Sequence, residues 1–454
     1  MECITHNPAT GEVFKTYPFL TKDEIHQRII ATHKTYNEWR FSSWGKREAC
    51  AKKLATLLRE RSGELAWIIT TEMGKTLVQA EQEVLKCVMA CEHYAKHAEK
   101  YLAPSEIHTQ MKKSSVIYQP LGIVLGIMPW NFPFWQAIRF AIPSLMAGNT
   151  CLLKHASNVT GCSIALEKLF LEAGFPQNAF TNLIIPNTQV SEVIKNPLVA
   201  AVTLTGSETA GRSVAAEAGH VLKKVVLELG GSDPYIVLED ADLDLAAYAI
   251  TTSRYTNSGQ SCIAAKRVLA VDAIREDLQQ RIIAIAKDYT YGDPMDPHTK
   301  LGPLARYDLR EALHKQVLIS VAQGANVPCG GYLPETVGYY YPATVLTDVP
   351  PGTPAYDEEL FGPVISFISV KNVEEAIKVA NASSFGLAAS IFTNNLEEAE
   401  RIALLIESGS VTINQFTVSD PRLPFGGIKN SGFGRELGSF GIHEFVNIKT
   451  INIA

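Results

Sequence analysis

Two short segments place a carboxylate and a thiol in turns that contain glycine. Glu228 opens a Glu-Leu-Gly-Gly segment, and Cys262 closes a Gly-Gln-Ser-Cys segment. A thiol attacks a carbonyl only as its thiolate, so it needs a base or a positive field nearby and a turn of small residues that exposes the sulfur. Addition to an aldehyde gives a thiohemiacetal, whose carbon carries a transferable hydride. That chemistry also requires an oxyanion donor, a nicotinamide and a base that activates water.

Other segments offer some of these groups. Asn131 lies in a Pro-Trp-Asn-Phe-Pro segment, whose prolines fix the backbone around one amide donor; the alternative is a turn in which the amide binds its own backbone. Lys154 ends a predicted strand, where the ribose edge of a dinucleotide would lie. The segment 424–436 is dense in glycine, which fits either a flexible loop or a backbone that wraps a ligand.

The segment 206–213 lies between a predicted strand and a predicted helix, a place that favours phosphate. It nearly matches a P-loop, but Arg212 replaces the lysine that would reach the terminal phosphates. A P-loop NTPase therefore stays open as an alternative.

Composition narrows the class of protein. The chain has 454 residues, and 41 basic against 47 acidic side chains give a net charge of −6, with no basic run typical of nucleic-acid binding. We find no leader and no apolar run long enough to span a bilayer, so a cytoplasmic protein is expected. The eight cysteines do not form a disulfide framework, and Cys87, Cys91, His93 and His97 lack a closed zinc pattern, so no metal is expected.

The pattern of apolar residues predicts the architecture. Residues 21–101 read as helices, beginning with a capping box at Thr21 and Glu24. Strands and helices alternate from residue 114 to about residue 218, and again from residue 235 to residue 414. Such βα repeats predict two doubly wound α/β domains with a cleft between them. The segments 114–119 and 445–453 alternate as edge strands, which favours pairing with another subunit.

Together these segments resemble the aldehyde dehydrogenase superfamily over nearly the whole chain. The matching elements occur in the family's order, and they are 129–133, 205–207, 228–231, 260–262, 359–363 and 424–436. The resemblance implies that residues 1–101 and 121–229 form a dinucleotide-binding domain and residues 230–430 a catalytic domain. It assigns 102–120 and 431–454 to an oligomerisation ribbon and C-terminal arm, in a homodimer or homotetramer.

The resemblance also implies roles for named residues. Cys262 is the expected nucleophile, Glu228 the base for the deacylating water, and the Asn131 amide with the Cys262 backbone N–H the oxyanion hole. The residues expected to contact the cofactor are Trp130, Lys154, Ser157, Gly206, Ser207, Glu359 and Phe361. Strict NAD enzymes of the family usually carry a glutamate where this chain has Ser157. A carboxylate there would repel a 2′-phosphate, so we expect NADP to be accepted and preferred over NAD; the alternative is that serine tolerates either.

The substrate is predicted from Arg139, which follows Asn131 on the next helix. Family members acting on succinic semialdehyde place an arginine here, and a guanidinium binds a carboxylate in bidentate fashion; the alternative is an arginine in a surface salt bridge. We expect Ser261, Ser419 and Arg422 to assist, with Trp135 restricting the funnel to a short substrate. Glutarate semialdehyde is an alternative substrate. A further alternative for the whole chain is a non-catalytic member of the family.

Overall fold

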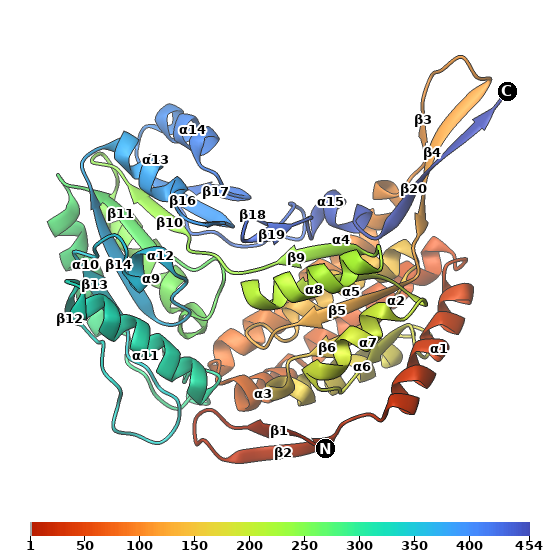
Figure 1. Cartoon of the computed structure of the whole chain (residues 1–454), viewed down its shortest axis with the longest axis horizontal. Coiled ribbons are helices and arrows are strands. Elements are labelled where there is room, and N and C mark those ends of the chain that lie inside the picture. The colour runs from red at the N-terminus through yellow and green to blue at the C-terminus, as the bar shows by residue number, and fades with distance from the viewer. Residues whose placement is uncertain (1) are drawn as a thin grey trace.

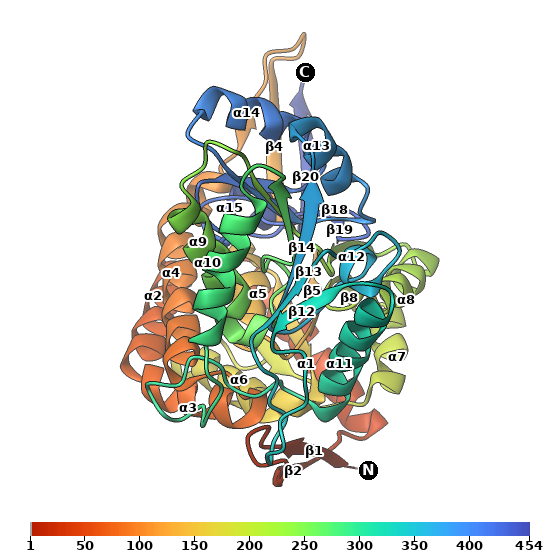
Figure 2. The same cartoon turned by 90° about the vertical axis from the view of Figure 1, so that its left-hand side faces the viewer.

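The computed structural model of this chain describes residues 2–454. Figure 1 shows two α/β bodies, each built around its own sheet, and a thin β-ribbon that projects away from both of them. The view in Figure 2, turned by a quarter, shows the same projection. The predicted pair of α/β domains with a ribbon is confirmed.

The first body holds a six-stranded sheet. Its strands lie in the order β19 (Gly432–Phe433), β9 (Lys224–Glu228), β8 (Val199–Thr205), β5 (Ile123–Met128), β6 (Thr150–His155) and β7 (Phe180–Asn182). All neighbours are parallel except β19, which runs antiparallel to β9. The central strand β5 is almost entirely buried, as expected for a parallel sheet covered on both faces.

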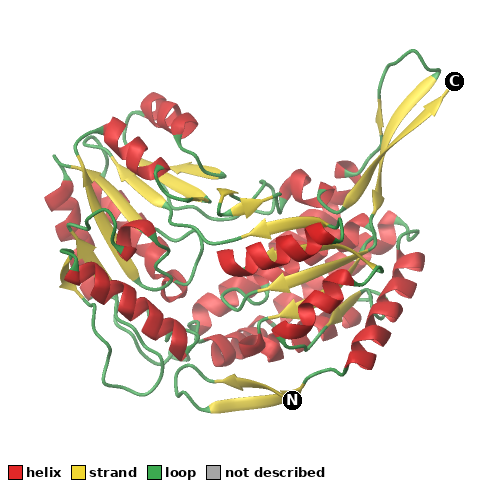
Figure 3. Cartoon of the chain, in the orientation of Figure 1, coloured by secondary structure: helices red, strands yellow, loops and turns green. Residues whose placement is uncertain are grey.

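Helices surround the strands of this sheet (Figure 3). They are α1 (Lys22–Trp39), α2 (Trp44–Glu60), α3 (Ser62–Met73), α4 (Leu77–Tyr101), α5 (Trp135–Ala147), α6 (Thr160–Glu172), α7 (Val190–Lys195) and α8 (Glu208–His220). The capping box at the start of α1 is present, because the Thr21 side chain accepts from the Glu24 backbone and the Glu24 side chain accepts from the Thr21 backbone. Cys87 and Cys91 are core residues of α4, and residues 2–454 contain no group of His, Cys, Asp and Glu side chains that could hold a metal ion.

The second body holds a seven-stranded sheet. Its order is β12 (Asn326–Cys329), β13 (Thr344–Thr347), β14 (Val364–Val370), β11 (Arg267–Val271), β10 (Pro234–Val237), β16 (Ala388–Phe392) and β17 (Ser410–Ile413). Only β12 is antiparallel to its neighbour. The helices of this body are α9 (Leu243–Tyr255), α10 (Arg275–Lys287), α11 (Tyr307–Ala322), α12 (Pro354–Asp357), α13 (Val373–Asn381) and α14 (Leu396–Leu405).

The chain returns to the first body after β17, which changes the predicted domain boundaries. The small strand β18 (Ile428–Lys429) pairs with β15 (Phe385–Gly386), and β19 then joins the first sheet beside β9. Helix α15 (Gly438–His443) packs against α4 and α5. The C-terminal arm was predicted to begin at residue 431, but the segment up to residue 445 is therefore part of the first body.

The ribbon is narrower than predicted and consists of β3 (Ser105–Glu106), β4 (Lys113–Pro120) and β20 (Val446–Ile453). Strand β20 pairs antiparallel with β4 from Val446 opposite Pro120 to Ile453 opposite Lys113. The sequence pattern did not predict a hairpin at the other terminus, made of β1 (Glu2–His6) and β2 (Val13–Pro18). Between residues 2 and 454, no helix combines the length and apolar character needed to cross a membrane.

Candidate active site

The predicted nucleophile lies in a tightly constrained turn between α9 and β11. The 3₁₀ segment Thr256–Gly259 precedes it, and Asn257, Ser258 and Gly259 all adopt positive φ angles of 56°, 50° and 75°. A Cβ on Gly259 would lie 2.2 Å from the carbonyl oxygen of Gly362, so only glycine fits there. Left-handed backbone at Asn257 and Ser258 is costly and persists only where the surroundings fix it. The turn therefore holds the half-buried Cys262 in one position.

Side-chain hydrogen bonds fix this turn to the Asn131 segment. The Asn257 amide donates to the carbonyl oxygens of Asn131 at 2.8 Å and Gln260 at 3.1 Å. The Asn131 amide nitrogen donates to the Gln260 carbonyl at 3.0 Å, and its oxygen accepts from Gln136 at 3.1 Å. One N–H of the Asn131 amide thus fixes its orientation, which leaves the second N–H for an oxyanion. Asn131 and Cys262 line the same cavity.

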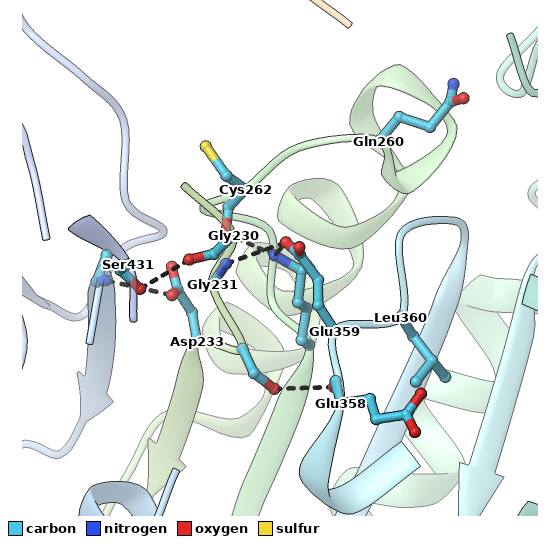
Figure 4. A network of polar contacts seen from close by, with 12 residues as sticks. Gly230, Gly231, Asp233, Gln260, Cys262, Glu358, Glu359, Leu360 and Ser431 are labelled. Carbon is cyan, nitrogen blue, oxygen red and sulfur yellow. Dashed lines mark hydrogen bonds and ion pairs between the residues drawn. The ribbon is translucent and has the colours of Figure 1, made fainter. Parts of the chain in front are cut away.

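The electrostatic surroundings keep the resting thiol protonated. Burial raises the pKa of Cys262 to about 11, against the opposing effect of the positive charges of Lys266 and Arg139. Lys266 donates to the Cys262 carbonyl oxygen at 2.6 Å and pairs with Glu359 at 2.8 Å. Figure 4 shows Sγ of Cys262 projecting away from the Glu359 carboxylate. The thiol at rest is therefore a weak nucleophile that needs a proton acceptor or an added positive field.

The predicted base, Glu228, ends β9 and is 2% exposed. Neither of its carboxylate oxygens has a hydrogen-bond partner within residues 2–454. Burial, followed by the negative charge of Glu436, raises the pKa of Glu228 well above its ordinary value. A Cβ on Gly426, in the glycine-dense segment, would lie 2.6 Å from Oε1 of Glu228. The glycine-dense segment thus lies directly against the carboxyl, and this fits close packing better than a flexible loop.

One cavity, of about 240 Å³, is lined by Cys262 and by five of the seven residues predicted to contact the cofactor. Trp130 and Phe361 meet edge to face with ring centroids 5.8 Å apart. Glu359 accepts from the Gly231 backbone at 3.1 Å, and a Cβ on Gly230 would lie 2.4 Å from its other oxygen (Figure 4). The lining combines aromatic surface with polar groups, which fits a planar ring bearing an amide. The cavity is lined by Pro129, Trp130, Asn131, Gln136, Thr205, Gly206, Ser207, Leu229, Gly230, Cys262, Leu309, Glu359 and Phe361.

The residues predicted to contact the remainder of the cofactor lie at the carboxyl ends of β6 and β8. Lys154 is the penultimate residue of β6, and its ammonium donates to the Asn187 side chain at 2.6 Å. Burial lowers the pKa of Lys154 to about 8. Ser157 is exposed at the start of the next 3₁₀ turn, and Ser207 caps α8 by accepting from the Ala210 backbone at 3.3 Å. A helix N-terminus and a lysine at this edge of a parallel sheet fit a dinucleotide.

The P-loop alternative gains no support from this geometry. Arg212, at the position of the P-loop lysine, pairs with Glu208 on the exposed face of α8. The Gly206 backbone N–H donates to the Glu228 carbonyl at 3.0 Å, so it is occupied within the sheet. A guanidinium neutralised by its own helix is poorly placed to bind terminal phosphates.

A second cavity, of about 320 Å³, lies on the other side of the nucleophile turn. Ser261, predicted to contact substrate, lines it together with Lys75, Gln79, Gln82, Glu83, Lys86, Phe132, Thr252, Ser253, Thr256, Asn257, Ile263, Phe416, Thr417 and Val418. Trp135 is buried beside it, with the Lys86 ammonium 4.5 Å from its ring centroid. Ser419 is also buried, and its hydroxyl accepts from Lys86 at 2.7 Å.

The two predicted arginine anchors lie elsewhere than expected. Arg139 is 3% exposed and forms an ion pair with Glu436, donates to Thr205 at 3.1 Å and stacks 4.9 Å from the Phe425 ring centroid. Arg139 is not among the residues that line the two cavities. The prediction that its guanidinium is open to the substrate funnel is therefore wrong for this structure, because the Glu436 carboxylate is already paired with it.

Arg422 also differs from the expectation. Its side chain is 72% exposed and pairs with Asp420 at 2.6 Å. It does not line the second cavity, because the local pair with Asp420 holds the guanidinium at the surface. The structure therefore does not place Arg422 at the predicted funnel.

Three charged side chains beside the second cavity were not predicted from the sequence. Lys75 and Glu83 form a buried ion pair, and Glu83 also accepts from the backbones of Phe134 and Trp135 at 2.8 and 3.0 Å. Glu83 thereby binds the N-terminus of α5 directly after the Asn131 segment. The third is Lys86, one turn further along α4. The only signal of Glu83 and Lys86 is helical spacing, and charged residues on an amphipathic helix ordinarily form its solvated face. Lys75 lies in the short link between α3 and α4 and belongs to no motif.

Comparisons with known proteins agree with this geometry. A model of the aldehyde dehydrogenase family matches residues 2–451. Succinate-semialdehyde dehydrogenase (NADP+) 1 of Mycobacterium tuberculosis is 46% identical over 457 residues, with both chains fully covered. Succinate semialdehyde dehydrogenase (NAD(P)+) Sad of Escherichia coli is 45% identical, covering 99% of this chain and 97% of the relative. The crystal structure of succinic semialdehyde dehydrogenase from Streptococcus pyogenes in complex with NADP+ superposes with a TM-score of 0.97 at 37% identity, covering 99% of each chain.

Proposed function

We propose that this chain, which belongs to the aldehyde dehydrogenase family, oxidises succinic semialdehyde to succinate with NADP as its preferred cofactor and NAD as an accepted one. The observation that carries the proposal is the pair of cavities that flank the Cys262 turn. One is lined by aromatic and polar groups, and the lining of the other includes Lys86, which has no carboxylate partner among the ion pairs of residues 2–454. The full-length relatives that act on this substrate by name support the choice of aldehyde.

The residues of this chain supply nucleophile, oxyanion hole and base. The Cys262 sulfur adds to the aldehyde carbon, while the free N–H of the Asn131 amide and the Cys262 backbone N–H bind the oxyanion. A bound nicotinamide supplies the hydride acceptor that allows the cysteine adduct to become a thioester. Glu228 then removes a proton from water, whose oxygen attacks the thioester carbonyl, and the Cys262 thiolate leaves as succinate is released. One oxyanion donor is typically worth about 10²–10³ in rate.

The burial of Glu228 suits this role. Burial raises its pKa and so favours the protonated form, and its oxygens have no hydrogen-bond partner in the described part of the chain. Once ionised, such a carboxylate is a stronger base than a solvated one, because desolvation disfavours its charge. We therefore infer that Glu228 acts after water has entered the site.

The preference for NADP rests on Ser157 and Lys154. Ser157 is exposed and adds no negative charge at the predicted ribose edge, while the Lys154 ammonium offers a positive one. A 2′-phosphate gains from that charge, whereas the ribose hydroxyls of NAD do not need it. The exposed ribbon, in which the Ile448 side chain is 64% exposed, supports assembly as a homodimer or homotetramer. A cytoplasmic location stays a prediction.

An initial-rate panel tests the proposal. Succinic semialdehyde, glutarate semialdehyde and butanal are assayed with NADP and with NAD, and the assay is repeated on Cys262→Ala. We expect the highest kcat/KM with succinic semialdehyde and NADP, and no turnover above background in the variant. If kcat/KM for butanal is equal to or higher than that for succinic semialdehyde, the proposal of an acidic substrate is refuted. If kcat/KM is higher for glutarate semialdehyde, the longer acid is the preferred substrate.

A further inference from the structure

Lys86 is the charged side chain of α4 that lines both the second cavity and a neighbouring surface depression; the amide of Gln82 also lines both. Lys86 lines the second cavity beside Ser261 and Thr256 and also a depression that contains Ser419 and Pro421. The side chain is partly buried, so its aliphatic stem is covered while its ammonium lies at the boundary between the two spaces. Lys86 therefore lines the same cavity as Ser261, the residue directly before the nucleophile.

The ammonium lacks the carboxylate partner that the other cations of this region have. Its polar contact is the Ser419 hydroxyl at 2.7 Å, and it lies over the Trp135 ring. None of the ion pairs within residues 2–454 includes Lys86, so no Asp or Glu oxygen lies within 4 Å of its ammonium. By contrast, Lys75 pairs with Glu83 and Arg139 pairs with Glu436.

The charges around Lys86 favour an incoming anion. Burial, followed by the positive charge of Arg139, lowers the pKa of Lys86 to about 8, against the opposing negative charge of Glu83, which is itself paired with Lys75. A partly desolvated ammonium near a second cation is destabilised, and a carboxylate that docks on it relieves both effects. The Arg139 guanidinium itself is paired with Glu436 and donates to Thr205, so Lys86 is the cation of this region left for an incoming carboxylate.

We propose that Lys86 is a specificity-determining residue that binds the carboxylate of the substrate, with the Ser419 hydroxyl orienting its ammonium. This inference rests on the proposed function, because it assumes that the aldehyde carries an acid at the far end from Cys262. An ammonium has three N–H donors, and one of them is given to Ser419. The other two remain for carboxylate oxygens. The substrate class is a short, unbranched ω-oxo acid whose carboxylate is held at Lys86 in the second cavity while its aldehyde meets Cys262 beyond Ser261.

The test compares Lys86→Met, Lys86→Arg and a matched control, Lys53→Met, which removes an exposed lysine from α2. Steady-state constants are measured for succinic semialdehyde and butanal with saturating NADP, together with the inhibition constant of succinate. We expect Lys86→Met to raise KM for succinic semialdehyde and the succinate inhibition constant by roughly 10- to 100-fold, the worth of a charge-assisted hydrogen bond. Butanal constants should stay within about twofold, and Lys86→Arg should restore most of the loss, because a guanidinium also forms charge-assisted hydrogen bonds with a carboxylate.

Equal losses for both aldehydes, or an unchanged succinate inhibition constant, would overturn the assignment of Lys86. Circular dichroism and the elution volume establish that each variant is folded, and Lys86→Gln, which keeps most of the stem, replaces Lys86→Met if the latter does not fold. A failure of the proposed function is recognised separately, because the unsubstituted enzyme would then show no preference for succinic semialdehyde over butanal. In that case the assignment of Lys86 falls with it.

Discussion

Replacing Arg139 with methionine would leave Glu436 as a buried carboxylate without its cation. The two side chains are 3% and 4% exposed, and the pair lies beside Glu228, whose pKa is raised in part by the charge of Glu436. Removing one partner of a buried ion pair typically costs about 3–5 kcal/mol, because the remaining charge is uncompensated. We therefore expect Arg139→Met to lower the free energy of unfolding by an amount in this range.

Urea unfolding of the enzyme without cofactor measures this loss. The double variant Arg139→Met/Glu436→Gln removes both charges, so it should recover most of the stability lost in the single variant. A loss below about 1 kcal/mol in the single variant would show that the pair is solvated, since exposed pairs are worth that little. A double variant as unstable as the single one would equally refute the argument, because it would assign the loss to packing against Phe425.

The pH dependence of the loss has a definite sign. Burial, the largest cause, raises the pKa of folded Glu436 above its value in the unfolded chain. A carboxyl with a raised folded pKa disfavours folding as the pH rises above the unfolded pKa, because the folded state then binds more protons. Removing Arg139 raises that pKa further. The deficit of Arg139→Met should therefore be largest at alkaline pH and shrink as the pH falls toward the ordinary glutamate pKa.

The same variant separates a structural role of Arg139 from direct contact with substrate. Because Glu436 and Thr205 already occupy the guanidinium, we expect kcat/KM for succinic semialdehyde and for butanal to fall by similar factors. A loss confined to succinic semialdehyde would show that Arg139 turns toward the substrate carboxylate during turnover, as the sequence alone predicted.

Two further predictions concern the cofactor and the thiol. Ser157→Glu places a carboxylate where a 2′-phosphate is proposed to bind, so the ratio of kcat/KM for NADP to that for NAD should fall by at least about tenfold, as expected for like-charge repulsion. The control Ser157→Ala separates that repulsion from the loss of a hydrogen-bond donor. An unchanged ratio in Ser157→Glu contradicts the argument. Because burial raises the pKa of Cys262 to about 11, its alkylation by iodoacetamide in the absence of cofactor should accelerate with pH throughout the range from 7 to 10; peptide mass spectrometry gives the rate at this residue, and a plateau near neutral pH would show that the resting thiol is already ionised.

The sequence predicted those features that depend on local backbone requirements. The turn before Cys262 needs a glycine with positive φ at Gly259, and the capping box at Thr21 marks the start of a helix from a few neighbouring residues. The alternation of strand and helix patterns predicted both sheets. These signals are visible because each one is contained in a short stretch of chain.

The remaining features depend on contacts between distant segments. Glu436 reaches Arg139 only because the chain returns to the first sheet as β19 and α15, and no local pattern marks that return. In the sequence, Lys86 is like any charged residue on the solvated face of a helix. Its contacts with Ser419 and Trp135 come from segments far along the chain. Ion pairs between residues far apart in the chain determine which cations keep a carboxylate partner, and a local sequence pattern does not show these pairs.

Trapping of the covalent intermediate tests the role of Cys262 most directly. Glu228→Gln retains the thiol and the oxyanion donors but lacks the base for deacylation. After mixing this variant with succinic semialdehyde and NADP, intact-protein and peptide mass spectrometry should find one succinyl group per chain, attached at Cys262, with one equivalent of NADPH formed in a burst. Undiminished steady turnover without a trapped acyl group, or an acyl group on another residue, would contradict the account.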